Sequence, residues 1–496
     1  MAEYQFEGLD PFEARRAKHD AWRALGIDPY PPKAGERQWV EEVRKGGEGM
    51  EAGGEPIGEK VGVGGRIMAL RNQGALCFMD VRDETGTIQV LVRRDAIDAE
   101  WFERLALLDI GDFVFASGQL FITRRGELTV AATEWRILTK SLRPLPDLWR
   151  GLQDIDQRQR QRYAELIVND EVRERFYKRS RFTAAIRQYL IDHKFTEVET
   201  PVLEHTPGGA DAEPFITHHN ALDTDFYLRI SLELHLKRLT VGGFERNFEL
   251  SRVFRNEGVS PQHLQEFTEL EFYYAYATYE DLIPFLEGMY VKAIQDTFGT
   301  LQITRGDKVL DFTAPWPRRT YRDLLLEYAG IDILTITDEE LVEHVKKHRV
   351  DTDVSLGRGR LLDQLYKKTV RPFLVQPMFM LDHPVEISPL AKRKPGEPRL
   401  TERLQILIDG AEVGNGFSEL NDPIDQRGRF EEQEKLRMDG DPEAMRMDTD
   451  FLRALEYGMP PTAGFGVGID RLFAIVAGVD SIRETVFFPT MRPESD

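Results

Sequence analysis

The stretch FRNEG, residues 254–258, ends a β-rich run of the chain. Alternate side chains of a strand project from one face, so Arg255 and Glu257 are expected side by side. A guanidinium can hold a phosphate or a carboxylate bidentately, and a carboxylate beside it can accept from an amine. Without the rest of the sequence, a simple ion pair between these two side chains is a better explanation of this stretch than a binding site. Far downstream, GFGVGIDRL at residues 464–472 combines glycines, which allow close backbone approach, with Arg471 at the start of a helix.

Around FRNEG the chain mixes helical and strand-like segments. Residues 169–195 are expected to form one long amphipathic helix with Asn169 as its cap. The segments after it predict an α+β domain around a largely antiparallel sheet flanked by helices, with a charged helical insertion at about residues 318–377. The apolar helix face comprises Val172, Phe176, Phe182, Ile186 and Leu190; strand-like runs are 196–203, 225–231, 244–258, 266–277, 403–417 and 481–488, and 431–438 is helical.

Upstream, residues 57 to 138 contain five short β-rich runs separated by glycine and charged turns. Five such strands predict a small β-barrel, and the OB-fold, which commonly binds single-stranded nucleic acid, is the economical choice. Pro144 and Pro146 then break the pattern, as a linker does. The expected domains are an N-terminal helical extension (1–56), the OB-fold (57–140), a linker (141–165) and the α+β domain (166–496).

Composition places the chain among soluble globular proteins of more than one domain. It has 496 residues, of which 41% are hydrophobic and 30% charged. The start is charged and lacks the apolar core of a secretory signal, and no run approaches a membrane span, so we expect a cytoplasmic protein without a membrane partner. A single cysteine, Cys77, excludes an intramolecular disulfide framework and a multi-cysteine zinc site.

The net charge of -20 argues against a nucleic-acid partner, because phosphate backbones attract basic proteins. A local basic face matters more than the total, and residues 12–23 and 154–163 are candidates for one. The alternative for each is a solvated helix face.

Three motifs in order make the chain resemble the class II aminoacyl-tRNA synthetases. The first is FTEVETPVL with Pro201, the second is FRNEG with the loop and strand after it, and the third is GFGVGIDRL. The first motif forms part of the dimer interface in that family, so the resemblance implies a homodimer. It also implies an ATP site in which Arg255 holds the α-phosphate, Phe267 and Arg471 sandwich the adenine, and both arginines are catalytic. The other ATP-binding residues would be Glu257, His263 and Glu412.

The amino-acid pocket resembles that of the lysyl members of the family. A cationic substrate needs a pocket lined by carboxylates, and this chain offers acids at the matching positions. The resemblance implies that Glu271 and Tyr273 engage the ε-ammonium and that Phe417 packs on the aliphatic stem. Glu233 and Glu419 would assist in the polar network, with Asn415 as a further lysine-binding residue.

The barrel carries candidates for reading the tRNA anticodon. Phe78 and Gln89 sit where the related aspartyl, asparaginyl and lysyl enzymes place the pair that reads the central uridine, with Arg66 nearby. Unpaired bases stack on aromatic side chains and bond through their edges, which suits these residue types. The alternative for Phe78 is a phenylalanine buried in the core of its own barrel.

The chain departs from the family pattern at several positions. The family holds Mg²⁺ against the ATP phosphates with two glutamates seven residues apart, and here these positions are Gln405 and Glu412. A neutral amide is a weaker magnesium ligand, so the site is expected to weaken or move. Other departures are Glu213 where arginine is usual, Leu232 where proline is common, and Leu264 with Gln265 where Asn-Pro is frequent.

The resemblance implies a lysyl-tRNA synthetase, which activates lysine with ATP and transfers it to tRNA(Lys) through a lysyl-adenylate. One alternative is a related enzyme that transfers lysine to a protein acceptor, but such relatives lack the anticodon barrel. A second alternative is a catalytically silent binding protein that keeps the fold. Arg255, Glu257 and Arg471 count against it, while Gln405 keeps it open.

Overall fold

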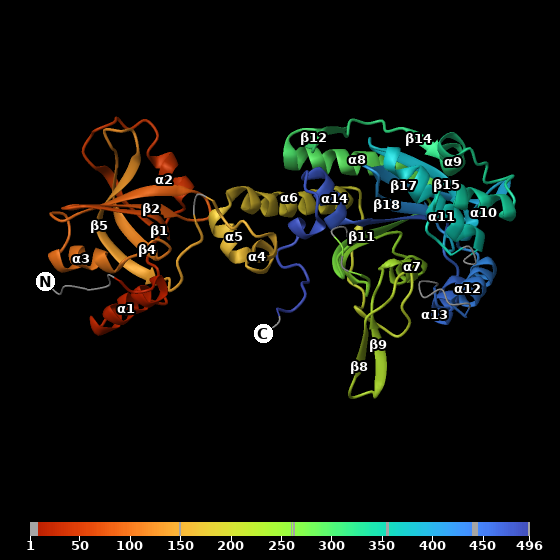
Figure 1. The fold of residues 1–496 in the computed structure, drawn as a ribbon, viewed down its shortest axis with the longest axis horizontal. Helices are drawn as coiled ribbons and strands as arrows, with labels where there is room; N and C mark the ends of the chain where they lie inside the picture. The colour runs from red at the N-terminus through yellow and green to blue at the C-terminus, as the bar shows by residue number, and fades with distance from the viewer. Residues whose placement is uncertain are drawn as a thin grey trace. The chain divides into compact units, whose positions relative to one another are not determined.

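The computed structural model describes residues 8–147, 150–258, 260, 263–353, 357–438 and 445–494. The chain divides into two compact units (Figure 1). Unit 1 comprises residues 1–153 and 163–168, and unit 2 comprises residues 154–162 and 169–496. None of the described helices is long and apolar enough to cross a lipid bilayer.

Unit 1 contains a closed five-stranded barrel with the strand order β1-β2-β3-β5-β4, which confirms the predicted OB-fold. Strands β3 and β5 are parallel, and every other neighbouring pair is antiparallel. The interior is filled by alternate side chains, including Cys77, Met79 and Val81 of β2. The strands are β1 (Ile57–Gln73), β2 (Leu76–Arg82), β3 (Thr87–Arg93), β4 (Phe113–Ile122) and β5 (Leu128–Thr139).

The helices of unit 1 pack on this barrel. Trp22 of α1 is fully buried and meets Trp135 of β5 edge to face. Arg15 donates to backbone carbonyls, and Lys18 pairs with Asp109, so part of the basic stretch 12–23 holds α1 in place. The helices are α1 (Pro11–Ala24), α2 (Val40–Gly46), α3 (Ala99–Glu103) and the 3-10 turn η1 (Arg104–Leu107).

The predicted long helix is present as α6 (Asp170–Asp192). The Asn169 side chain accepts from the backbone N–H of Val172, so the predicted cap is confirmed. All five predicted apolar residues are buried. Shorter helices precede it: α4 (Ile155–Arg160) and α5 (Arg162–Val168).

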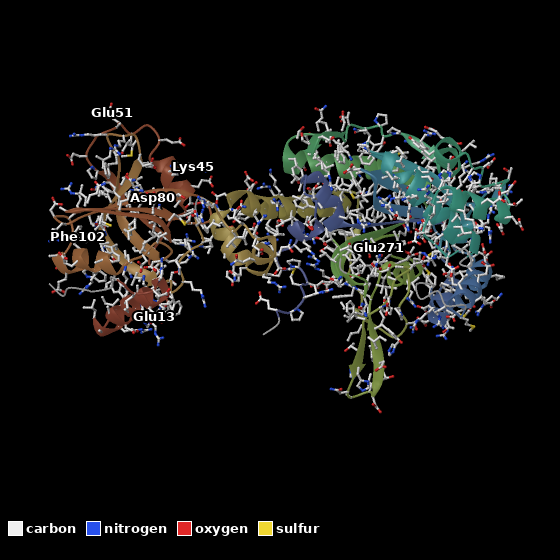
Figure 2. The ribbon with its side chains drawn as sticks, viewed as in Figure 1. Glu13, Lys45, Glu51, Asp80, Phe102 and Glu271 are labelled. Carbon is white, nitrogen blue, oxygen red and sulfur yellow. The ribbon has the colours of Figure 1, made fainter. Side chains whose placement is uncertain are left out.

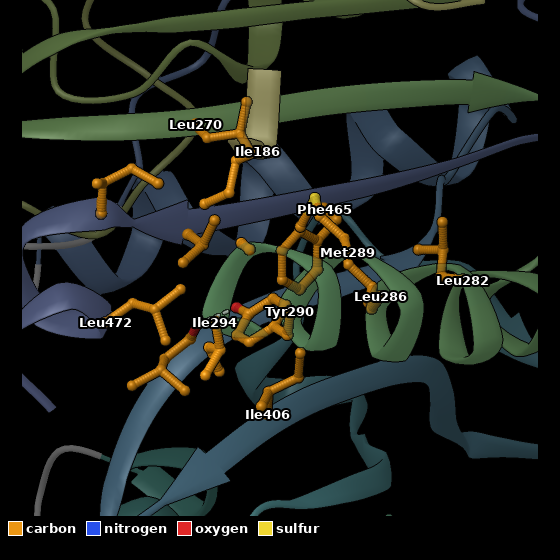
Figure 3. Packing of buried hydrophobic residues seen from close by; sticks show 14 of the residues in the cluster. Ile186, Leu270, Leu282, Leu286, Met289, Tyr290, Ile294, Ile406, Phe465 and Leu472 are labelled. Atoms are coloured by element: carbon orange, nitrogen blue, oxygen red, sulfur yellow. Dashed lines mark hydrogen bonds between the residues drawn. The ribbon is translucent and has the colours of Figure 1, made fainter. Parts of the chain in front are cut away.

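Unit 2 is built on a nine-stranded sheet with the order β14-β15-β17-β18-β19-β11-β10-β6, and β16 pairs with β17. Only the outer pairs β14/β15 and β10/β6 are parallel, which confirms the predicted α+β class. Apolar residues of α8 (Tyr279–Phe298) and α14 (Ile469–Val476) pack under the central strands (Figure 3). The strands are β6 (Thr196–Glu197), β10 (Arg246–Phe254), β11 (Glu266–Ala275), β14 (Arg318–Thr320), β15 (Met378–Pro384), β16 (Arg393–Lys394), β17 (Glu397–Ile408), β18 (Ala411–Ser418) and β19 (Thr462–Gly468).

Smaller elements complete unit 2. Helices α9, α10 and α11 pack against one end of the sheet through a separate hydrophobic cluster. The strands are β7 (Leu203–Glu204), β8 (Ile216–His219), β9 (Thr224–Leu228), β12 (Gln302–Arg305) and β13 (Lys308–Asp311); the helices are α7 (Glu233–Val241), α9 (Tyr321–Ala329), α10 (Asp338–Lys347), α11 (Gly357–Thr369), α12 (Pro423–Met438) and α13 (Thr449–Glu456), with 3-10 turns η3 (Arg371–Phe373), η4 (Val385–Ile387) and η5 (Ile482–Thr485).

Two strand predictions were wrong. Residues 481–488 contain the 3-10 turn η5 (Ile482–Thr485) instead of a strand, because Ser481 caps this turn and the side chains of Ile482 and Val486 pack in an apolar cluster. Residues 196–203 contribute only β6 and the first residue of β7, and Pro201, which lacks a backbone N–H, lies between them.

Candidate active site

One pocket of about 320 Å³ lies in unit 2. It is lined by side chains of β11, β18 and β19, by residues at the start of α7 and of α14, and by the segment that follows β10. Twelve of the residues predicted from the sequence line it: Glu233, Arg255, Glu257, His263, Phe267, Glu271, Tyr273, Glu412, Asn415, Phe417, Glu419 and Arg471.

Strand β11 forms one wall through its two-residue period. Phe267, Glu269, Glu271 and Tyr273 all line the pocket, and Glu271 is labelled in Figure 2. Opposite Tyr273, strand β19 carries Gly464. A Cβ at Gly464 would lie 2.1 Å from Oε1 of Glu419 and 2.5 Å from the Tyr273 ring, so only glycine fits there.

Glu271 is held by three donors. Its Oε1 accepts from the Ser231 hydroxyl at 2.7 Å and from the Leu232 backbone N–H at 2.9 Å. Its Oε2 accepts from the Tyr273 hydroxyl at 2.9 Å. Proline has no N–H, so leucine at position 232 adds a donor to this carboxylate. Burial and the surrounding carboxylates raise the pKa of Tyr273 well above its usual value, which keeps its hydroxyl a donor.

A buried lysine that the sequence analysis missed joins two other acids. Lys237 of α7 is fully buried, lies 2.5 Å from Glu233 and also pairs with Glu419. Burial opposes its charge, but the two carboxylates raise its pKa above the usual value. Burial raises the pKa of Glu233 to about 7 in spite of Lys237, and burial also raises that of Glu419. The Glu233–Lys237 spacing is a helical i,i+4 pair, a signal that could have revealed it.

Arginines gather at the other end of the pocket. Arg255 follows the last residue of β10, so the prediction that it and Glu257 project from a strand was wrong. Its Nε donates to the Ile230 carbonyl, and its guanidinium lies 5.1 Å from the Phe267 ring centre. Arg471, in the first turn of α14, donates to the Glu412 carbonyl at 3.3 Å.

Buried Asp470 fixes α14 against β11. Its carboxylate accepts from the Arg179 side chain at 2.5 Å and from the Thr268 N–H at 2.8 Å. Because Asp470 and Thr268 are the neighbours of Arg471 and Phe267, this contact sets the relative position of the two predicted adenine-binding side chains. Burial lowers the pKa of Arg471, opposed by Glu412.

The loop after FRNEG is described only in part, since Pro261 and Gln262 lie outside the described residues. Ring nitrogen Nδ1 of His263 lies 2.8 Å from the Ser260 hydroxyl, and burial together with Arg471 lowers its pKa. Leu264 is buried beside Phe267, and the Gln265 carbonyl accepts from the Arg255 N–H. The Leu264 side chain therefore supports Phe267, whereas the contact to Arg255 is made by the backbone and does not depend on the side chain at position 265.

The predicted pair of metal ligands does not meet in the pocket. Glu412 lines it, but Gln405 is buried in β17 next to the imidazole of His383 and is not part of the pocket wall. Burial holds the pKa of His383 well below its usual value, so a neutral amide suits that environment. Within the described part of the chain, no group of three or more His, Cys, Asp or Glu side chains is arranged to hold a metal ion. Glu213 is exposed, and its carbonyl accepts from the Asn256 N–H.

The barrel brings two of its three candidates together. Phe78 is half-buried on the outer face of β2, between the buried residues Cys77 and Met79, and lies outside the barrel's hydrophobic cluster. Asp80, two residues after Phe78 on β2 and labelled in Figure 2, pairs with Gln89 of β3. Phe78 and Gln89 are therefore diagonal neighbours on the same face of the barrel wall. Gln89 accepts from the Thr129 hydroxyl at 3.1 Å.

Arg66 lies at the opposite end of the β1–β2 ladder from Phe78, paired with Arg82. It donates to the Gly111 carbonyl at 3.0 Å, and its guanidinium lies 4.3 Å from the Phe113 ring centre. Burial and Arg82 lower its pKa. Its side chain is therefore engaged within the barrel.

Comparison with known proteins gives two family matches. Residues 154–492 match the tRNA synthetases of class II (D, K and N), and residues 61–138 match the OB-fold nucleic acid binding domain. The chain is 48% identical over 480 residues to a lysine–tRNA ligase of Dehalococcoides mccartyi, covering 96% of each chain. It is 46% identical over 488 residues to a lysine–tRNA ligase of Thermotoga maritima, covering 98% of this chain and 97% of the relative.

Proposed function

The chain belongs to the class II tRNA synthetases of the D, K and N group, and from this premise we propose that it activates lysine with ATP and transfers it to tRNA(Lys). The observation that carries the proposal is a single pocket with arginines at one end and a hydrogen-bonded carboxylate and phenol at the other. Arginines suit the anionic phosphates of ATP, and the carboxylate suits an ammonium.

The lysine side chain enters the end of the pocket formed by Glu271 and Tyr273. Glu271 is the ion partner of the ε-ammonium, and its three donors hold it in a single position. Phe417 covers the aliphatic stem. Glu233 and Glu419 act through Lys237, which they share, and Asn415, fixed by Arg403 at 2.8 Å, borders the same space.

ATP binds at the arginine end. The adenine lies between the Phe267 ring and the Arg471 guanidinium, because both present flat faces that attract a π system. Arg255 holds the α-phosphate, which requires its guanidinium to turn toward ATP from its place over Phe267. Glu257 and His263 complete this end of the pocket.

In the first step the lysine carboxylate attacks the α-phosphorus of ATP, a bond to pyrophosphate breaks, and lysyl-adenylate forms. In the second step the terminal ribose hydroxyl of tRNA attacks the lysyl carbonyl, and AMP leaves. Arg255 brings the lysine carboxylate and the α-phosphate together and stabilises the charge that develops at phosphorus, while Arg471 positions ATP by holding its adenine. No covalent enzyme intermediate is needed, and we assign no general base.

Magnesium is the proposed companion of ATP. Mg²⁺ is commonly held by one or two carboxylates together with substrate phosphates and water, so Glu412 alone suits it, while Gln405 is no longer proposed as a ligand. When bound, such an ion would neutralise phosphate charge.

The OB-fold barrel reads the anticodon in this proposal, with Phe78 as the stacking residue and Gln89 as the edge-bonding residue. Arg66 supports the barrel at the other end of the β1–β2 ladder. We assign anticodon binding to residues 57–140 and catalysis to residues 166–496. A homodimer and a cytoplasmic location complete the proposal, and gel filtration at monomer size would contradict the dimer.

The test is ATP–pyrophosphate exchange with the full chain, measured separately with each of the twenty amino acids. Lysine alone is expected to support exchange, and Arg255→Ala is expected to reduce it by about 10²–10³-fold, the effect of losing one donor to a developing charge. Arg252→Ala is the matched control, since Arg252 is an exposed arginine of β10 three residues away. Exchange with no amino acid, or with another one, would refute the proposal.

A further inference from the structure

Two carboxyl groups of β11 meet inside the pocket. Glu269 and Glu271 are two residues apart, so both project from the same face of the strand, and both line the pocket. The two groups lie close enough for a side-chain hydrogen bond between them. Ionised carboxylates accept hydrogen bonds and donate none, so this bond requires a proton on one of the two groups. The two-residue alternation of β11 could have revealed the pair from the sequence.

Glu269 is the member of the pair that suits the proton. Glu271 accepts three hydrogen bonds from its surroundings, which suit a carboxylate. Oε2 of Glu269, in contrast, is buried, and no described residue donates a hydrogen bond to it. Burial and the charge of Glu271 raise the pKa of Glu269 to about 8. Glu269 is therefore largely protonated at pH 7 in the absence of lysine.

The charged neighbours of Glu269 act on it in opposite directions. Arg255, in the segment after β10, lies 3.7 Å from its Oε1 and opposes the rise in its pKa. Glu233 of α7 favours the protonated form in the same way as Glu271, but its effect is smaller. The charge of Glu271 is therefore the nearby charge that does most to keep Glu269 protonated. The residues opposite Glu269 on the two adjacent strands are uncharged: Ser251 of β10 and Gly468 of β19.

We propose that lysine binding expels the proton from Glu269, an inference that rests on the proposed function. The ε-ammonium of lysine neutralises the charge of Glu271 and so removes the main reason for Glu269 to stay protonated. The proton passes to the buffer, the ammonium keeps its own protons, and Glu269 becomes a carboxylate 3.7 Å from Arg255. Glu269 is thus a positioning residue, because its charge then holds one end of the Arg255 guanidinium beside the lysine carboxylate and the α-phosphate.

Isothermal titration calorimetry of the full chain with L-lysine counts the released protons. The apparent binding enthalpy is compared in Pipes and in Tris, because the difference between the two equals the number of protons transferred times the difference in the buffers' ionisation enthalpies. Full ionisation of Glu269 in the complex corresponds to release of about 0.9 proton at pH 7.0 and about 0.2 at pH 8.5, since a group with a pKa of about 8 is already largely ionised at the higher pH.

Glu269→Gln keeps the shape and the donor of a protonated glutamate but has no proton to release. At pH 7.0 its proton count is expected to be lower than that of the unmodified protein by about 0.9. Any release from Glu233, whose pKa is raised to about 7, persists in this variant, so the difference isolates Glu269. Glu269→Met is expected to give the same loss, and Glu245→Gln, an exposed glutamate next to β10, is expected to leave the count unchanged.

The unmodified protein alone can overturn the inference, through lysine binding without proton release at pH 7.0 or through an equal count at pH 7.0 and 8.5. The same release from Glu269→Gln as from the unmodified protein would overturn it as well. Absence of lysine binding to the unmodified protein would instead overturn the proposed function.

Discussion

Replacing Lys237 with methionine removes a fully buried cation from between two carboxylates. Lys237 is 0% exposed, and Glu233 and Glu419 both depend on it for charge compensation. Methionine fills a similar volume without the charge. Removing one partner of a buried ion pair destabilises a protein by about 3–5 kcal/mol, because the remaining charge is left uncompensated.

The size of this loss depends on pH. When folding raises the pKa of an acid, the fold loses stability as pH rises from the pKa of the unfolded state to the pKa of the folded state. Above the pKa of the folded state the loss stays constant. For Glu233 in the unmodified protein that window runs from 4.5 to about 7. Without Lys237 the carboxyl stays protonated to higher pH, so the deficit of the variant grows above pH 7 by about 1.4 kcal/mol per pH unit.

Urea unfolding of the full chain at pH 6.0, 7.0 and 8.5, followed by circular dichroism, measures this deficit. Between pH 7.0 and 8.5 it is expected to increase by about 2 kcal/mol for Glu233 alone. Lys237→Met combined with Glu419→Gln should recover part of the loss, and Lys292→Met, which removes an exposed i,i+4 partner, is the control. A deficit that is the same at all three pH values would refute the reasoning.

Three other substitutions test separate parts of the molecule. Phe267→Ala is expected to raise the KM for ATP about tenfold in pyrophosphate exchange, because a stacked base contributes about 1–3 kcal/mol; an unchanged KM would exclude stacking there. Phe78→Ala is expected to lower kcat/KM for tRNA charging by about tenfold while exchange without tRNA is unaffected, and a parallel loss of exchange would point to a folding defect. Gly464→Ala is expected to weaken lysine binding in calorimetry, because the new Cβ would lie 2.1 Å from Oε1 of Glu419, and normal affinity would contradict the close approach.

Local patterns were sufficient for much of the architecture. The cap at Asn169 and the five buried residues of α6 follow from helical periodicity, and the barrel strands follow from short alternating runs. The twelve predicted pocket residues come from segments with recognisable motifs, and the fold brings them together. These features could be predicted because each depends mainly on residues close in the sequence or on a motif present in one segment.

The amino-acid sequence by itself therefore indicated the five-stranded barrel, the helix α6, the α+β class of the second domain and twelve of the residues around the pocket. Only the tertiary structure decided which charges meet. Lys237 finds Glu419 from a distant segment, Leu232 supplies a backbone N–H to Glu271, and Gln405 is placed beside His383 instead of in the pocket. The physical reason is that the pKa and the partner of a buried group depend on sheet register and burial, which arise from contacts between segments far apart in the chain.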